Sequence, residues 1–347
     1  MTDPDSLVSH PFERLLPAYA DAQASLERIE ERLRLSPVRR PWKGRMAIAE
    51  RQALARVDGV DFDLAQVHVD GRGTVSSSVY DLTHWKRAIG SAITLEAILN
   101  DPEDLLDWLG VADVEHVSAV THRQRAEIMQ SMGAWVRAVK GLPPSPPLLH
   151  GGRLAAVWRQ HAPLGRGDTV ASLLIGDRWG AGRWNGSQGG LTALGLTLTG
   201  AAWKVAQGEV LDRIWLAAVT AGAQAHLQME VRLRGYAARA SQKLAARRRP
   251  GRLKDLLLLA MAQPYVTSSH VARSLELTSA GAIKLLTIAT DEGLLLERSG
   301  QASYRSYAIP VSEPASSPTG GSRLAATAFE PDFWSEEGEI EASQEPF

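Results

Sequence analysis

Nine positively charged side chains lie close together in the second half of the chain, and such side chains bind phosphate. They occur within residues 231–254, and no acidic residue interrupts them. Guanidinium and ammonium groups at this density can neutralise the phosphates of a nucleic acid. A solvated helix face followed by a basic linker gives the same pattern, and Pro250 and Gly251 favour a hinge there. The nine residues are Arg232, Arg234, Arg239, Lys243, Arg247, Arg248, Arg249, Arg252 and Lys254.

The residues after this basic run predict two short helices separated by a turn. Ser268 and Ser269 favour the start of a helix over HVARSLEL, whose apolar residues can reach one core. Thr278 and Ser279 interrupt that helix and favour the start of a second one. Gly293 favours the end of the second helix, because glycine readily adopts the left-handed conformation found there.

The second helix has one apolar face, and its small residues let it pack close to the first helix. The apolar residues recur at the spacing of a buried helix face, and the others point away from it. The expected buried residues are Ala282, Leu285, Leu286 and Ala289, and the expected outward-facing residues are Ala280, Lys284, Thr287 and Asp291.

Two further runs, residues 294–298 and 304–309, can pair as a β-hairpin around a turn at residues 299–300. Helix, turn, helix and hairpin in this order outline a winged helix-turn-helix. Such a domain can place its second helix in the major groove of DNA, and Arg298 and Arg305 of the hairpin would meet phosphate. The pattern indicates a DNA-binding protein, and a transcriptional regulator is the function that we expect.

The expected DNA-binding residues come from the basic run, the helix starts, the outward face of the second helix and the hairpin. They are Arg247, Arg248, Arg249, Arg252, Ser268, Ser279, Ala280, Lys284, Thr287, Arg298 and Arg305. Lys284 is the one positive charge on the second helix, which carries no Arg, Asn or Gln for bidentate contacts to bases. Strong base-specific readout is therefore not expected. Winged helices also serve as protein-interaction modules, so an interaction adaptor remains an alternative.

The composition limits the other classes of function. The chain has 347 residues, of which 44% are hydrophobic and 22% charged, which is enough for two or three folded units. It has no cysteine, which excludes disulfides and thiolate catalysis. No pair of histidines has a metal-binding spacing such as HExxH, and we expect neither a metal nor a cofactor. No apolar stretch has transmembrane length and no signal peptide is recognisable, so we expect a cytoplasmic protein without a membrane partner.

Helical periodicity dominates the chain, and we expect a mainly α protein with thin strands near residues 64–69 and in the hairpin. Helices are expected at residues 15–35, 44–57, 80–99, 102–109, 114–139, 152–161 and 211–246. We divide the chain into an N-terminal helical region (1–140), a central helical region (141–246), the winged helix-turn-helix (247–310) and a disordered acidic tail (311–347). The tail carries eight acidic residues against one arginine, and it could bind a partner or shield the basic surface.

The central region resembles the Fic-type AMP-transferases. The sequence AAVWRQHAPLGRGDTVASLLIGDRW, from Ala155, is similar to their motif His-x-Phe-x-(Asp/Glu)-Gly-Asn-Gly-Arg-x-x-Arg followed by an apolar helix. The resemblance implies a helical Fic-like body with His161 as the catalytic base. The sequence RMAIAERQALARVDGV resembles the inhibitory helix in the N-terminal part of that family. The order of an N-terminal segment, a helical core and a C-terminal winged helix also matches the family.

Several charges that the AMP-transfer chemistry needs are missing. Aligned from His161, Gly165 occupies the acidic position, and Thr169 and Ser172 occupy the two arginine positions. Arg166 and Asp168 lie nearby, but no shift of one or two residues restores the motif. The resemblance therefore implies a degenerate Fic-like core. A divergent Fic-type transferase that uses His161 is the alternative function, and a hydrogen-bonded structural histidine is the simpler interpretation of that residue.

The whole layout also resembles uncharacterised plasmid-associated bacterial proteins that join a domain of unknown function to a C-terminal helix-turn-helix. This resemblance covers most of residues 47–310 and implies an architecture without naming an activity. Helix-turn-helix proteins commonly bind paired half-sites as dimers. We therefore consider DNA, a second copy of the chain and another protein as partners.

The Gly-rich stretch GDRWGAGRWNGSQGGLTALG, residues 176–195, has two interpretations. It lacks the Lys-Ser/Thr ending of a phosphate-binding loop, and no clear strand precedes it. Trp179 and Trp184, with Arg178 and Arg183, could stack on bases. Packing between helices is the more common role of such residues.

Overall fold

The computed structural model describes residues 12–59, 67–69, 75–77, 94–109, 124–165, 168–181, 190–247, 251–299, 305–311 and 334. Most of these residues are helical and the strands are short, which confirms the expected mainly α class. The chain divides into two compact units. Unit 1 comprises residues 1–31 and 46–227, and unit 2 comprises residues 32–45 and 228–347. The four regions expected from the sequence stay predictions.

The N-terminal helices were largely predictable from their apolar spacing. Helix α1 (Leu16–Leu35) carries the expected stripe, with Leu26 and Ile29 buried. Helix α2 (Arg39–Val57) begins earlier than the predicted residue 44. Strands β1 (Val67–Val69) and β2 (Val75–Ser77) pair antiparallel, with Val67 opposite Ser77. Strand β1 falls within the predicted region, whereas β2 was not predicted.

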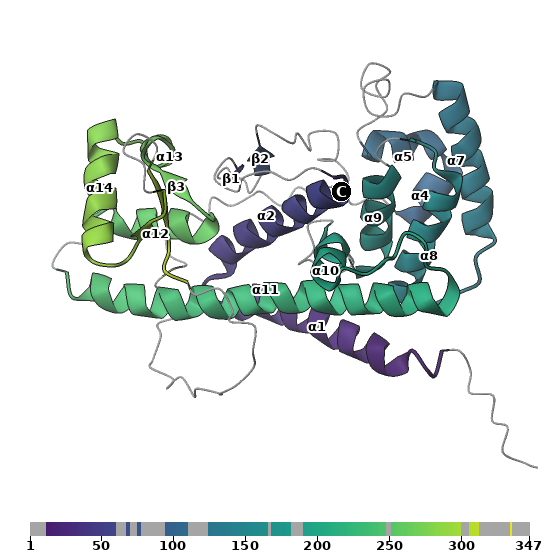
Figure 1. Ribbon diagram of the computed structural model, residues 1–347, viewed down its shortest axis with the longest axis horizontal. Coiled ribbons are helices and arrows are strands. Elements are labelled where there is room, and N and C mark those ends of the chain that lie inside the picture. The colour runs from purple at the N-terminus through teal and green to yellow at the C-terminus, as the bar shows by residue number, and fades with distance from the viewer. Residues whose placement is uncertain are drawn as a thin grey trace, which may run out of the picture. The chain divides into compact units, whose positions relative to one another are not determined.

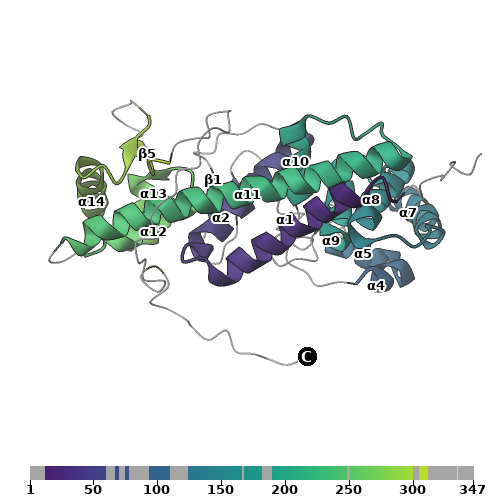
Figure 2. The ribbon, with the colours of Figure 1, turned by 90° about the horizontal axis from the view of Figure 1, so that it is seen from below.

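Unit 1 is mostly helical, and α8 and α9 lie beside the first part of α11 (Figure 1; Figure 2 gives a second view). Tryptophans fill its core. Trp135 and Trp158 make an edge-to-face contact with ring centroids 5.2 Å apart, and Trp203 and Trp215 make another at 6.5 Å. The helices after α2 are α4 (Leu95–Asn100), α5 (Pro102–Trp108), α7 (Arg125–Lys140), α8 (Pro147–His161), α9 (Asp168–Trp179), α10 (Leu191–Thr199) and α11 (Gly208–Ala245), which continues into unit 2.

Glycines allow these helices to approach each other at backbone distance. A Cβ atom on Gly151 of α8 would lie 2.4 Å from the carbonyl oxygen of Gly176 in α9. A Cβ atom on Gly195 of α10 would lie 1.7 Å from the carbonyl oxygen of Ala218 in α11. Both distances are impossible for a real side chain. Gly176 and Gly195 belong to the Gly-rich stretch, so these glycines pack helices together.

Several helix boundaries differ from the sequence prediction. Helix α8 begins at Pro147, inside the Pro-rich segment 141–149, because proline is tolerated in the first turn of a helix. Helix α10 was not predicted, since its glycine and threonines have low helix propensity. The predicted helix 80–99 lies mostly outside the described residues, and α4 covers its end.

Unit 2 joins the last part of α11 to three short helices and a small sheet. The sheet order is β3–β5–β4, and both pairings are antiparallel. Val266 lies opposite Tyr307, and Leu296 lies opposite Ala308. In chain order the elements are α12 (Leu253–Ala262), β3 (Val266–Thr267), α13 (Ser268–Ser274), α14 (Ser279–Asp291), β4 (Leu296–Glu297) and β5 (Ser306–Ala308).

Buried and partly buried polar contacts hold unit 2 together. Arg45 donates to the carbonyl oxygens of Met261 (2.8 Å) and Ala260 (3.2 Å), which satisfies carbonyl groups at the end of α12. Burial lowers the pKa of Arg45 to about 9. The Tyr236 hydroxyl donates to the carbonyl oxygen of Leu294 at 2.9 Å and thereby fixes the chain just after α14.

The expected disordered tail lies almost entirely outside the described residues. Trp334 is described, and its side chain is 3% exposed. This tryptophan is therefore buried, while the rest of the tail prediction stays untested.

Candidate nucleic-acid interface

Helix α13 begins with a side-chain cap one residue earlier than the sequence suggested. Thr267 is the N-cap, and its hydroxyl accepts a hydrogen bond from the backbone N–H of His270 at 3.2 Å. Ser268 is the first helical residue and is half-buried, whereas Ser269 is exposed. Ser268 therefore lies at the start of the helix, as expected, without capping it.

Helix α14 presents the outward face that its sequence predicts. The Thr278 hydroxyl caps the helix by accepting from the N–H of Gly281 at 3.1 Å. The inward residues Ala282, Leu286 and Ala289 are buried, and Leu285 is half-buried. The exposed residues include the four predicted DNA contacts Ser279, Ala280, Lys284 and Thr287.

The same face contains an apolar residue that the sequence analysis did not single out. Ile283 is 54% exposed, and it follows Ser279 by four positions and precedes Thr287 by four. Residues spaced by four share one helix face, so the spacing alone could have identified it. Through this exposed isoleucine, a mostly polar face can also contact an apolar group.

The β4–β5 hairpin forms where it was expected, and residues 300–304 of its connection lie outside the described residues. The strands are shorter than the predicted runs. Both predicted phosphate contacts are exposed, and Arg305 lies 3.6 Å from Glu297 in an ion pair. The backbone N–H of Arg298 donates to the carbonyl oxygen of Ser306, and the side chain of Arg298 is exposed.

Part of the basic run is engaged within unit 2. Arg247 forms an ion pair with the Glu292 carboxylate, and Lys243 donates to the Glu292 carbonyl oxygen. Cations are favourable at the C-terminal end of a helix, where Glu292 caps α14. Lys243 of α11 and Arg247 just after that helix therefore fasten this part of the chain to the end of α14, and the guanidinium of Arg247 already has a carboxylate partner.

The other predicted contacts of the basic run are Arg248, Arg249 and Arg252, and Arg239 belongs to the same run without being one of them. Arg252 donates to the carbonyl oxygen of Leu275 and pairs with Asp255 at 3.3 Å, although about half of its side chain is exposed. Arg248 and Arg249 lie outside the described residues. Arg239, on α11, is exposed.

The segment that resembles the Fic motif includes the end of α8 and the start of α9. His161 is the last residue of α8 and is half-buried. Asp168, which sequence analysis placed near the missing acidic position, is 7% exposed. Its carboxylate accepts hydrogen bonds from the indole N–H of Trp158 (2.8 Å) and from the N–H groups of Leu164 (3.0 Å) and Gly165. Asp168 thus closes the loop between the helices, and Arg166 lies outside the described residues.

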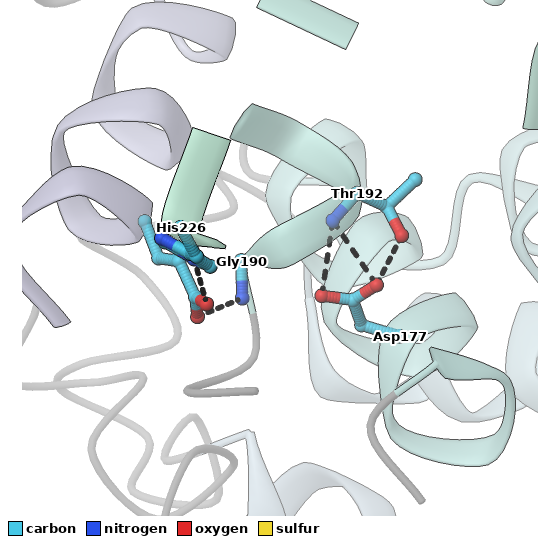
Figure 3. Close-up of polar contacts among 5 residues, drawn as sticks. Asp177, Gly190, Thr192 and His226 are labelled. Carbon is cyan, nitrogen blue, oxygen red and sulfur yellow. Dashed lines mark hydrogen bonds and ion pairs between the residues drawn. The ribbon is translucent and has the colours of Figure 1, made fainter. Parts of the chain in front are cut away.

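Sequence analysis missed a buried polar cluster in unit 1 (Figure 3). Glu50 of α2 is fully buried and pairs with Nε2 of His226 in α11 at 2.9 Å. Its second carboxylate oxygen accepts from the N–H of Gly190 at 3.1 Å, at the start of α10. Close by, the Asp177 carboxylate of α9 accepts from the hydroxyl and the N–H of Thr192. These side chains join four helices, and no local spacing in the sequence connects them.

Burial changes the acidity of this cluster. Burial raises the pKa of Asp177 to about 7, the hydrogen bonds from Thr192 oppose that rise, and the negative charge of Glu50 adds to it. Burial also lowers the pKa of Arg51, next to Glu50, to about 10. Among the residues that the structure describes, no group of three or more His, Asp or Glu side chains can hold a metal ion. Likewise, no helix in the described part of the chain is long and apolar enough to cross a membrane.

Two comparisons, with protein-family models and with curated proteins, found no match. The resemblances drawn from the sequence therefore stay expectations, and a function must be argued from the residues and their geometry.

Proposed function

We propose that the protein binds DNA through unit 2 and acts as a transcriptional regulator. In this proposal residues 247–310 of unit 2 form a winged helix-turn-helix, α14 is its recognition helix and the β4–β5 hairpin is its wing. The order α12, β3, α13, α14, β4 and β5, with β5 between β3 and β4, supports this assignment.

The exposed face of α14 is the observation that carries the proposal. Its residues Ser279, Ala280, Lys284 and Thr287 are small, polar or basic, and Ile283 adds one exposed apolar side chain, while the opposite face is buried. The major groove of DNA is about 12 Å wide and admits an α-helix whose outward side chains are of this kind. The first N–H groups of a helix have no partner within it, so the start of α14 also suits a phosphate group.

The chemistry of this face favours modest base discrimination. Lys284 can donate to the acceptor atoms of guanine, and Ala280, Ile283 and the Thr287 methyl group can contact thymine methyl groups. Arg298 of the hairpin and Arg239 of α11 supply exposed charge for phosphate. We therefore expect a large salt-dependent component in the binding free energy and a smaller sequence-dependent one.

Selection from a pool of genomic DNA fragments tests this function. The purified protein is mixed with fragments that include the region upstream of its own gene, at two salt concentrations, and the retained DNA is sequenced. We expect retention of most fragments at the lower salt and enrichment of particular sequences at the higher salt. Retention at neither concentration would refute DNA binding, and uniform retention that disappears at higher salt would refute a specific regulator.

We further propose that the Fic-like body of unit 1 does not transfer AMP. The missing acidic and arginine positions support this, and so does the use of Asp168 to close the loop after His161. Without these charges the body lacks a site for Mg²⁺ and the triphosphate. We expect no saturable ATP binding in calorimetry with Mg²⁺ present. Saturable binding that His161→Ala abolishes, together with label transfer to a protein hydroxyl, would establish the enzyme instead.

A further inference from the structure

Unit 1 contains a cavity of about 830 Å³ that DNA binding does not explain. It lies among the residues ahead of α1, the Pro-rich segment 142–146, helix α8 and the start of α11. Pockets for small molecules usually have volumes of roughly 300–1,000 Å³ and mostly apolar walls. The cavity therefore has the size of a small-molecule site.

Specific contacts fix the walls of this cavity. The guanidinium of Arg159 lies 4.7 Å from the ring centre of Trp203, and its Nη1 donates to the Trp203 carbonyl oxygen at 2.8 Å. These contacts hold the segment between α10 and α11 against α8. Arg153 of α8 also pairs with Asp212 of α11 at 3.1 Å. Because these walls are already in place, the protein loses little conformational freedom when a ligand enters.

The ionised side chains of the lining are already paired. Arg153 has Asp212 as its partner, and Glu209 has Arg213. An anion or a cation entering the cavity would therefore lose hydration without meeting an unpaired opposite charge. Among the uncharged polar side chains of the lining, Gln160 and Gln207 are exposed, and each amide can donate and accept hydrogen bonds.

We propose that this cavity binds a neutral, amphipathic small molecule. Its apolar body contacts Phe12, Val157 and Leu211, and its single polar group hydrogen-bonds to the amide of Gln160 or Gln207. This site is independent of the proposed DNA interface, because every residue of its lining belongs to unit 1.

Two fluorescent probes with the same aromatic body test the proposal on the full chain. N-phenyl-1-naphthylamine is neutral, and 8-anilinonaphthalene-1-sulfonate adds a negative charge to that body. We expect saturable binding of the neutral probe at one site, with an affinity at least about tenfold above that of the sulfonate, or roughly 1.4 kcal/mol. Equal or tighter binding of the sulfonate would overturn the assignment of a neutral ligand.

Substitutions then locate the bound probe. Ala156 lines the cavity, and Ala156→Trp should fill it and weaken binding of the neutral probe by about tenfold or more. Leu198→Trp, at an exposed position of α10 outside the cavity, is the matched control and should leave the affinity within about twofold. If circular dichroism shows that Ala156→Trp is unfolded, Gln160→Trp at an exposed part of the lining replaces it. Unchanged binding in the folded cavity variant would overturn the proposal.

Discussion

Ionisation of Asp177 illustrates how the fold changes the chemistry of a single residue. The carboxyl group ordinarily has a pKa of 3.8, and burial in unit 1 raises that pKa to about 7. Between about pH 4 and pH 7 the Asp177 carboxyl of the folded protein therefore keeps a proton that the unfolded chain has already lost. Its contribution to stability is complete below pH 4 and is lost as the pH rises through 7.

Replacing this carboxyl group should remove that pH dependence. Between pH 5 and pH 7 the free energy of unfolding of the native protein should fall by up to about 2 kcal/mol through Asp177 alone. Asp177→Asn has no ionisable group there, so its free energy of unfolding should change less over the same interval. Urea denaturation at several pH values measures both slopes.

Thr192 supplies the internal check on this explanation. Its hydrogen bonds to Asp177 lower the pKa of the carboxyl group, so Thr192→Val should raise that pKa and move the loss of stability to higher pH. Identical pH slopes in the native protein, Asp177→Asn and Thr192→Val would show that Asp177 does not titrate as described.

The cations of the basic run show why residue type alone does not define a binding site. Arg247 and Lys243 belong to a run that suggested phosphate contacts, yet both contact Glu292 at the end of α14. The sequence places these residues 45 and 49 positions from their partner, so no local pattern reveals the contacts. In the proposed function their role is indirect, because they hold the end of the proposed recognition helix.

At the scale of the element, local patterns predicted helices well where one face is apolar and caps are present. Helix α14 has the predicted faces because Ala282, Leu286 and Ala289 recur at helical spacing after the Thr278 cap. Helix α10 was missed because Gly195 and its threonines disfavour a helix locally. The helix forms nevertheless because it packs against α11, and this close approach requires Gly195.

A methyl group at Gly195 should therefore disrupt the packing of α10 on α11. The added Cβ would lie 1.7 Å from the Ala218 carbonyl oxygen, and Gly195→Ala should destabilise the protein by about 2 kcal/mol or more. Gly133 of α7 is the matched control, because its Cβ would have only the Arg137 side chain nearby, at 3.7 Å. Gly133→Ala should be neutral or stabilising by up to about 1 kcal/mol. Thermal and chemical denaturation compare the two, and equal effects would contradict this account of the helix contact.

At the scale of the whole molecule, the mainly α class followed from the dominance of helical periodicity. The exposed face of α14 was also predictable, because it depends on residues only a few positions apart. The cluster of Glu50, Asp177 and His226 was not, because four helices bring it together. The cavity could not be predicted from the sequence either, because the Arg153–Asp212 pair in its lining joins residues 59 positions apart.

The most direct test of the central claim reverses one charge on the proposed recognition helix. Lys284→Glu and the control Lys204→Glu, an exposed lysine of unit 1, change the net charge of the protein equally. Fluorescence anisotropy with a labelled duplex from the selected fragments measures both affinities at one salt concentration. We expect Lys284→Glu to weaken binding by about tenfold or more and Lys204→Glu to change it by less than about twofold. Equal affinities in the two variants would contradict DNA recognition by α14.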